Sequence, residues 1–164
     1  MRSATRHPAA PDFTLTDQHG ASWTLSSQRG KAVALYFGFT HCPDTCPLTL
    51  GKLAKAIGND SNAEIVFVTV DPERDTPQVM NAYLKRFSPA QIVGLTGTPK
   101  QIADVERAYH VWAQKIPGKR GKYDYDEAHI SVVQFIDPNG RQRSIADQDD
   151  SVTTLASDMR STMQ

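Results

Sequence analysis

Cysteine is scarce in this chain, since Cys42 and Cys46 are the two that occur among 164 residues. Two cysteines are too few for the class of small secreted domains that depend on several disulfides for their stability. Because the pair is separated by only three residues, the spacing instead favours a local redox site or metal site.

Net charge and long apolar runs are also absent. Lysine plus arginine number 18, and so do aspartate plus glutamate, so no overall field attracts the chain to nucleic acid. The longest strongly apolar stretch, residues 32–39, is much shorter than the about 20 residues that a transmembrane helix requires, and no signal peptide opens the sequence. We expect a soluble protein that binds no nucleic acid and that attaches to a membrane only through an anchor outside this chain.

The composition is that of one ordinary folded domain. Hydrophobic residues make up 39% and charged residues 22% of the chain, a balance that allows one sizeable core. The sequence shows no internal repeat, no low-complexity tract and no linker rich in glycine or serine. We therefore expect residues 1–11 to form a flexible lead, and residues 12–164 to form a single, monomeric domain.

Hydrophobic patterns predict strands in the first half of the chain. Apolar and polar residues alternate on both sides of residues 17–20, which is typical of a hairpin at the edge of a sheet. Residues 32–37 and 65–70 are nearly continuous apolar runs, as expected for central parallel strands buried on both faces. Between these runs, an amphipathic pattern that ends at Gly58 predicts a helix.

Proline and glycine mark the elements of the second half. Threonine–proline pairs at 76–77 and 98–99 predict two helix starts, because threonine is a good N-cap and proline suits the first helical position. Residues 130–136 are predicted to form a strand that ends in a turn at 137–140, and residues 151–163 a closing helix. This order indicates an α/β fold, a three-layer sandwich with an N-terminal β-hairpin, a central mixed sheet and flanking helices, and a thioredoxin-like arrangement fits it.

Both cysteines lie in the segment HCPDTCP, residues 41–47, where the first buried strand gives way to a helix. In α/β folds the functional crevice lies at the carboxyl ends of the strands, so this position favours a site. Each cysteine precedes a proline and should avoid helical backbone angles, which places both outside the helix, with Cys46 near its cap and Pro47 in its first turn. The positive end of the helix would then favour the thiolate form of the sulfurs.

The spacing of the cysteines leaves two chemistries open. Three intervening residues allow a disulfide to close, and they also allow the two sulfurs to occupy separate corners of a metal's coordination sphere. His129, between an acidic segment and the start of the last core strand, is a candidate third ligand for copper or zinc. His41 competes with it, because it is adjacent to Cys42.

Two charged segments are predicted to be structural. Asp71, Arg74 and Asp75 precede the predicted helix start at 76–77, and we expect a loop that caps this helix and holds itself with an ion pair worth about 0.5 to 1 kcal/mol. The basic residues of the stretch 115–122 are expected to lie in a solvated loop.

Three segments of the chain resemble the Sco/SenC family of copper proteins. Residues 37–47, FGFTHCPDTCP, are similar to the signature of that family, residues 68–77, VTVDPERDTP, resemble the segment after its next strand, and residues 95–98, LTGT, resemble a third. The resemblance implies a thioredoxin fold and copper held by Cys42, Cys46 and His129.

The same resemblance implies a role in maturing the binuclear copper site of cytochrome c oxidase. The implied partner is the copper-accepting subunit of that oxidase or another copper chaperone, and the implied location is the periplasm or an equivalent membrane face. Under this hypothesis the chain is a copper metallochaperone whose soft, low-coordination site suits Cu(I).

Two other functions compete with copper delivery. In a thiol-disulfide oxidoreductase, Cys42 would attack a partner's disulfide and Cys46 would resolve the mixed disulfide, without any need for His129. A peroxide-reducing enzyme of the same fold would also place a reactive cysteine at the start of this helix, although the usual surroundings of that cysteine are missing here.

Overall fold

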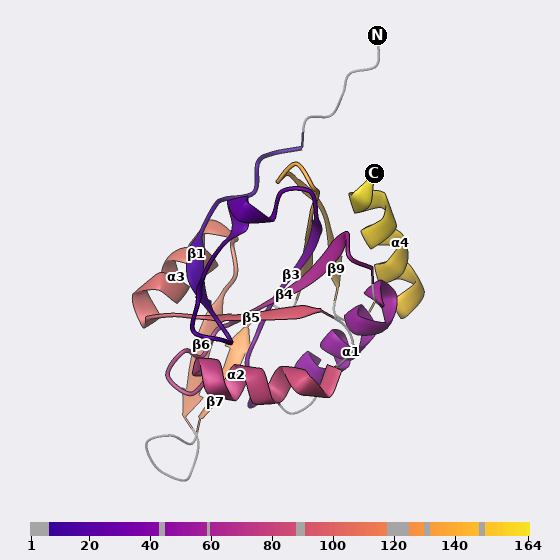
Figure 1. The fold of residues 1–164 in the computed structure, drawn as a ribbon. Helices are drawn as coiled ribbons and strands as arrows, with labels where there is room; N and C mark the ends of the chain where they lie inside the picture. The colour runs from indigo at the N-terminus through magenta and orange to yellow at the C-terminus, as the bar shows by residue number, and fades with distance from the viewer. Residues whose placement is uncertain are drawn as a thin grey trace.

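A computed structural model describes residues 7–42, 45–58, 60–87, 91–117, 125–129, 132–147 and 150–164, with the backbone alone for residues 45, 115–117 and 125–129. The centre of the fold is one seven-stranded sheet in the order β2-β1-β5-β4-β3-β8-β9 (Figure 1). Its strands are β1 (Thr14–Asp17), β2 (Ser22–Thr24), β3 (Ala32–Gly38), β4 (Ala63–Thr69), β5 (Ile92–Thr96), β8 (Val132–Ile136) and β9 (Gln142–Asp147). The sheet is mixed, because β3, β4 and β5 are parallel while β1, β8 and β9 run antiparallel to their neighbours.

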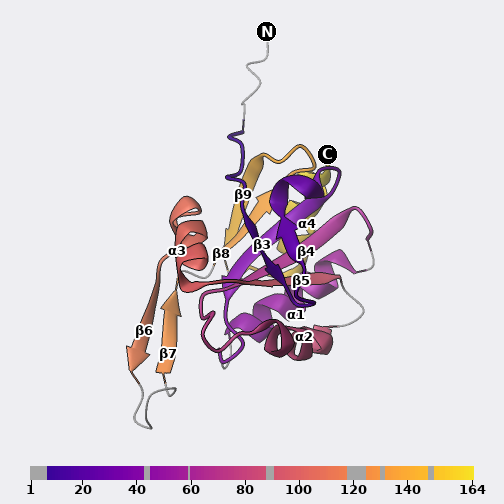
Figure 2. The same ribbon diagram turned by 60° about the vertical axis from the view of Figure 1, so that its left-hand side comes forward.

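Helices cover both faces of this sheet (Figure 2). The helices are α1 (Thr45–Ile57), α2 (Pro77–Leu84), α3 (Pro99–Ala108) and α4 (Val152–Met163), with short 3-10 turns η1 (Leu25–Gln28) and η2 (Lys85–Phe87). α1, α2 and α4 pack on one face. α3 lies on the other face, where Tyr109 packs its ring 6.1 Å from that of Phe37 in β3. The predicted three-layer sandwich with an N-terminal hairpin at one edge is therefore confirmed.

The helix starts follow the sequence signals closely. The hydroxyls of Thr76 and Thr98 each accept a hydrogen bond from a backbone amide three residues ahead, and the next residue in both cases is the proline that begins the helix. Ser151 caps α4 in the same way. At the other end of α1, Gly58 adopts a positive φ of 59°, the left-handed conformation in which glycine ends helices at little cost.

The structure departs from the predicted elements in the region after α3. β6 (Ala113–Pro117) and β7 (Tyr125–His129) form a separate two-stranded antiparallel sheet, which stands beside the main sheet below α3 (Figure 2). Part of the stretch predicted to be a solvated loop is thus a strand, because antiparallel pairing satisfies its backbone without requiring an apolar pattern. β5 was also not predicted. This strand is short and contains a central glycine, which weakens the strand pattern in the sequence.

The segment at the start of the described chain is attached to the sheet. Ala10 donates a backbone hydrogen bond to Gly140, Gln142 donates one to Pro8, and Ala9 pairs with Arg141. The first six residues of the predicted lead lie outside the described residues. Within the part of the chain that the structure describes, none of the helices combines the length and the apolar character that crossing a bilayer requires.

The core consists of the two central strands and the side chains packed on them. Every residue of β3 and of β4 is buried, which confirms the prediction that these apolar runs are central and parallel. One of these buried residues carries an ionisable group. Glu64 in β4 is 6% exposed, and its Oε2 atom has no hydrogen-bond partner among the described residues. Burial raises the pKa of this carboxyl, while the nearby charge of Lys31 acts in the opposite direction.

Glu64→Gln should make the protein more stable at high pH and leave its stability at low pH unchanged. Because its pKa is raised, the carboxyl stays protonated to a higher pH in the folded protein than in the unfolded chain. The contribution of Glu64 to stability therefore falls as pH rises above the ordinary glutamate pKa. Glutamine carries no charge, so we expect the free energy of unfolding of the variant to be about 1 kcal/mol higher than that of the wild type at pH 8. Urea unfolding at pH 4 and pH 8 measures the effect, and an equal difference at the two pH values would contradict it.

Candidate metal centre

The two cysteines lie at the carboxyl end of the central strand β3. Cys42 follows this strand, and Cys46 is the second residue of α1. The prediction that both cysteines lie outside the helix is therefore wrong for Cys46. A proline in the first helical turn costs no hydrogen bond, because the first amides of a helix have no partner within it. Pro47 thus allows the helix to begin two residues before it.

The surroundings of the two sulfurs are unequal. Both cysteines are free thiols, Cys42 half-buried and Cys46 fully buried. The backbone amide of Cys46 points at the sulfur of Cys42, with 3.4 Å between nitrogen and Sγ. This confirms the expectation that the first turn of the helix directs an amide toward a sulfur, here that of Cys42. The sulfur of Cys42, the less buried of the two, therefore has the contact that favours a thiolate.

Cys46 is held in the protonated form. A hydrogen bond with the Cys42 side chain raises the pKa of the Cys46 thiol well above its usual value, and burial adds to the shift. Phe39 and Tyr36 lower the pKa of this thiol but do not prevail. The expectation that the helix favours the thiolate is thus wrong for Cys46, because the neighbouring Cys42 and burial outweigh the helix.

Gly38 provides the space that the Cys46 sulfur occupies. A β-carbon at this position would lie 2.7 Å from Sγ of Cys46 and 2.7 Å from a ring carbon of Phe67. Both distances are shorter than van der Waals contact, so only the hydrogen of glycine fits here. The last residue of β3 thus allows the helix to bring its sulfur directly onto the sheet.

Asp75 joins the ends of the two central strands. Its fully buried carboxylate accepts hydrogen bonds from the backbone amide of Thr40 at 3.0 Å, the hydroxyl of Thr40 at 2.5 Å and the hydroxyl of Thr69 at 2.6 Å. Thr40 precedes the cysteine motif, and Thr69 ends β4. Burial raises the pKa of Asp75, although its three donors act in the opposite direction. The carboxylate therefore fixes the loop that leads to Cys42.

Asp71 and Arg74 form the ion pair that the sequence predicted. Nε of Arg74 lies 2.5 Å from a carboxylate oxygen of Asp71, and the two side chains are 10% and 0% exposed. The pair is much more buried than a surface loop would allow. Because a charge left alone in such a place is costly, removing either partner should cost about 3 to 5 kcal/mol rather than the smaller value expected for an exposed pair.

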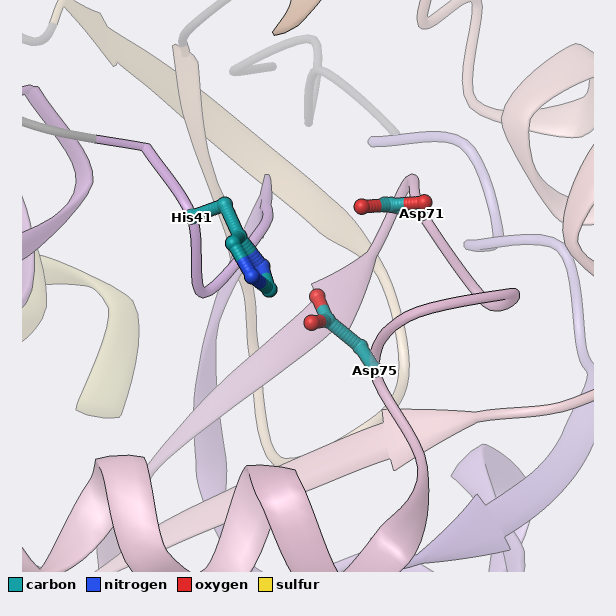
Figure 3. Close-up of side chains that lie close together, drawn as sticks. All are labelled: His41, Asp71 and Asp75. Carbon is teal, nitrogen blue, oxygen red and sulfur yellow. The ribbon is translucent and has the colours of Figure 1, made fainter. Parts of the chain in front are cut away.

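His41 faces these carboxylates (Figure 3). One ligand atom from each of His41, Asp71 and Asp75 lies within 4.8 Å of the others, and Nδ1 of His41 is 3.3 Å from the Thr40 hydroxyl. Sequence reasoning did not predict this group, because it assigned Asp71 and Asp75 to a helix-capping loop. The signal that could have found it is that the three side chains follow β3 and β4, which are neighbouring parallel strands. Hydrogen bonds and the Arg74 cation already occupy the carboxylates, so the group is better suited to bracing the loops than to holding a metal.

His129, the predicted third ligand, is the last residue of β7, opposite Ala113 in β6. It was expected between the acidic segment and the last core strand, and it does precede that strand, β8, but it ends a hairpin strand that the sequence did not predict. The sequence from 125 to 129 pairs with β6 rather than extending β8. The side chain of His129 lies outside the described side chains, and its role as a ligand stays a prediction.

A cavity of about 310 Å³ opens beside the motif. Its lining residues come from the loop after β3 and from α2 and η2, namely Thr40, His41, Val79, Ala82, Tyr83 and Arg86. A larger cavity of about 460 Å³ lies between Tyr109 and β9 and includes no residue of the cysteine motif. The smaller cavity is the one that adjoins the sulfur-bearing loop.

Comparison with known proteins gives consistent matches over nearly the whole chain. The pattern of the SCO1/SenC family matches residues 2–164. An SCO2-like protein of Rickettsia conorii is 39% identical over 134 residues, which are 79% of this chain and 65% of that protein. The chain thus spans about two thirds of the length of this relative.

Solved structures agree with the fold. Bradyrhizobium japonicum ScoI with copper bound superposes with a TM-score of 0.83 at 36% identity, covering 94% of this chain and 99% of the other. Apo Sco1 of Thermus thermophilus gives a TM-score of 0.85 at 31% identity, covering 97% and 94%. These likenesses confirm the predicted thioredoxin-like architecture.

Gly38→Ala should destabilise the protein, because its methyl group would collide with Cys46 and Phe67. Overpacking of this kind costs about 1 to 3 kcal/mol. Gly51, within α1, is the matched control. A β-carbon there meets nothing within 4 Å, so Gly51→Ala should instead stabilise the helix by about 0.5 to 1 kcal/mol. Urea unfolding of both variants compares them, and equal effects would show that the space at Gly38 is not restricted.

Asp75→Asn should weaken the connection between β3 and β4. The amide group of asparagine replaces one accepting oxygen with a donor, which leaves at least one buried donor unpaired and costs about 2 kcal/mol. Asp104→Asn is the control, because the ion pair of Asp104 with Arg107, at 3.6 Å, is exposed and worth about 0.5 kcal/mol. Thermal unfolding of both variants provides the comparison, and a loss no larger than that of the control would refute the bracing role.

Proposed function

The chain belongs to the SCO1/SenC family, and from this premise we propose that it binds copper through Cys42, Cys46 and His129 and delivers the ion for assembly of cytochrome c oxidase. The observation that carries the proposal is the arrangement of two reduced cysteines at the end of β3, one half-buried and one buried. Copper is the cargo of this function rather than a resident cofactor.

The donor atoms suit copper in its reduced state. The side-chain hydrogen bond between the two cysteines brings their sulfurs together, so both can reach one ion. Two thiolates with an imidazole form a soft, low-coordination site, which Cu(I) prefers. We assign the imidazole to His129 on family resemblance, and the hairpin β6–β7 that carries it is a separate element from the helix that carries Cys46.

The unequal exposure of the cysteines suggests an order of binding. Cys42 is reachable from solvent and receives the amide contact that favours a thiolate, so it makes the first bond to an arriving ion. Cys46 then exchanges its proton for copper, since metal binding to thiols releases protons. Release to a partner would also begin at Cys42, because its bond to copper is the one that the partner's thiolates can reach.

Family membership supports the partner and the location that we propose. ScoI of Bradyrhizobium japonicum and Sco1 of yeast have been solved with copper bound, and other relatives are mitochondrial proteins of Arabidopsis thaliana and Bos taurus. We propose the copper-accepting subunit of cytochrome c oxidase, or another copper chaperone, as the partner, and the periplasmic side of a membrane as the location.

Thiol-disulfide exchange is the second candidate, and the same asymmetry favours it. The Cys42 thiolate would attack one sulfur of a partner's disulfide, form a mixed disulfide and release a partner thiolate. Cys46 would then attack the Cys42 sulfur, so that the partner leaves with two thiols and this chain holds the Cys42–Cys46 disulfide. An external thiol reductant would be required for another cycle.

An anaerobic titration of reduced protein with Cu(I) against a competing chelator tests the proposal. We expect one tight equivalent, lost in Cys42→Ala and Cys46→Ala. His129→Ala should bind about 100-fold more weakly, which corresponds to about 2.7 kcal/mol. His41→Ala is the control and should bind like the wild type, because His41 faces Asp71 and Asp75.

The variants also separate the two candidate functions. Copper binding that depends on both cysteines and on His129 supports delivery. Weak binding, or binding that survives His129→Ala, would remove the ligand assignment and favour disulfide exchange, which needs no histidine. Rates of exchange with a model disulfide, measured on the same variants, complete the comparison.

A further inference from the structure

The cavity of about 310 Å³ beside the cysteine motif is lined in part by a cation, Arg86. This residue belongs to η2 and is exposed. None of the ion pairs between described residues includes it, and neither of the two candidate functions uses its side chain. A small number of placed polar groups in a concave site is what gives such a site its specificity for a ligand.

An aromatic ring holds the Arg86 guanidinium in place. The guanidinium carbon lies 5.4 Å from the centroid of the Tyr83 ring, which is a cation–π distance. The ring is itself fixed, since it stacks on Phe67 at 5.9 Å and meets Phe87 at 5.6 Å. The face of a ring offers no oxygen to the five N–H donors of a guanidinium, so this contact positions the charge and leaves it able to bind an anion.

The rest of the lining suits an anion on a short apolar stem. Val79, Ala82 and the Tyr83 ring provide apolar surface, and Val79 is 37% exposed. No carboxylate is among the described residues that line the cavity. An aspartate or glutamate side chain would place its methylene groups against Val79 and its oxygens at Arg86. A guanidinium binds such a group through two parallel N–H donors.

The carboxylates that His41 faces already have partners of their own. Asp71 pairs with Arg74, and Asp75 accepts three hydrogen bonds from two threonines. Both of these acidic residues are fully buried, whereas Arg86 is exposed. A ligand that enters the cavity therefore meets the positive charge of Arg86 directly.

The cavity adjoins the more accessible sulfur of the pair. His41 lines the cavity, and Cys42 is the next residue, so their α-carbons are about 3.8 Å apart. Cys42 is also the half-buried cysteine, the one that a partner's sulfur can reach. A molecule that brings a sulfur to Cys42 thus has a neighbouring group close to the cavity.

We propose that this cavity is a carboxylate subsite, in which Arg86 binds an acidic side chain of the partner whose sulfur meets Cys42. The inference rests on the proposed function and names the chemistry of its partner, a protein with an aspartate or glutamate close to its cysteines. Basic and acidic residues are equal in number in this chain, so no overall field selects a partner by charge. A cation within contact distance of the ligand does so locally.

The test compares how fast Cys42 reacts with two aromatic disulfides. Dithiobis(nitrobenzoate) carries two carboxylates, and dithiodipyridine carries none. In both reactions the Cys42 thiolate attacks one sulfur of the reagent, the reagent's disulfide breaks, a mixed disulfide forms and an absorbing thiol product leaves. The ratio of the two rate constants for the first released product measures the preference for the anion. It cancels any change in the reactivity of Cys42 itself.

Arg86→Gln should lower this ratio about 3-fold to 10-fold at about 0.1 M salt, because it removes one unit of charge at contact distance from a carboxylate. Arg86→Glu should lower it further. Both losses should shrink at about 1 M salt, where the screening length falls to about 3 Å. Arg107→Gln is the matched control, since Arg107 is also exposed but lies in α3, on the other face of the sheet. It should leave the ratio unchanged.

The outcomes separate this inference from the function on which it rests. An unchanged ratio in Arg86→Gln, or an equal loss in Arg107→Gln, would overturn the carboxylate subsite and leave the result of the copper titration as it stands. A loss that persists undiminished in concentrated salt would also overturn it, because the effect would then come from shape rather than charge. Absence of tight Cu(I) binding would instead overturn copper delivery, while the ratio of rates would still measure the preference of the cavity.

Discussion

The carboxylate of Asp75 is the constraint on which the cysteine site depends. It accepts hydrogen bonds from Thr40, at the exit of β3, and from Thr69, at the end of β4. Two parallel strands side by side leave their exit loops next to each other, but nothing in the strand pairing fixes those loops. A buried acceptor with three donors does so, and the motif that follows Thr40 is held against the sheet as a result.

The sulfur pair shows how one short motif produces two different chemical environments. The same helix start that supplies an amide to Cys42 buries Cys46 on the glycine at the end of β3. The sulfur of Cys42 is thus partly open to solvent, and that of Cys46 is buried at the end of β3. Spacing alone does not distinguish these roles, because they arise from the sheet beneath the motif.

Most of the main fold could be predicted from the sequence, because the signals were local. Threonine and serine caps mark three helix starts, and continuous apolar runs mark two strands, without any knowledge of the rest. β5 and the hairpin β6–β7 could not be predicted, since their stability depends on pairing with distant partners. The same reason explains the site: Cys42 and Cys46 lie in one motif, whereas the roles of Gly38 and Asp75 depend on contacts between separate elements.

The burial of Cys46 on the central strands has a kinetic consequence. β3 and β4 are the most enclosed strands of the fold, and such segments open only in the rarest fluctuations of a native protein. Any reagent that requires direct access to this sulfur must wait for a movement of α1, whereas Cys42 reacts without one. Oxidants and alkylating agents in the surroundings therefore meet a single accessible thiol, which limits accidental loss of the pair.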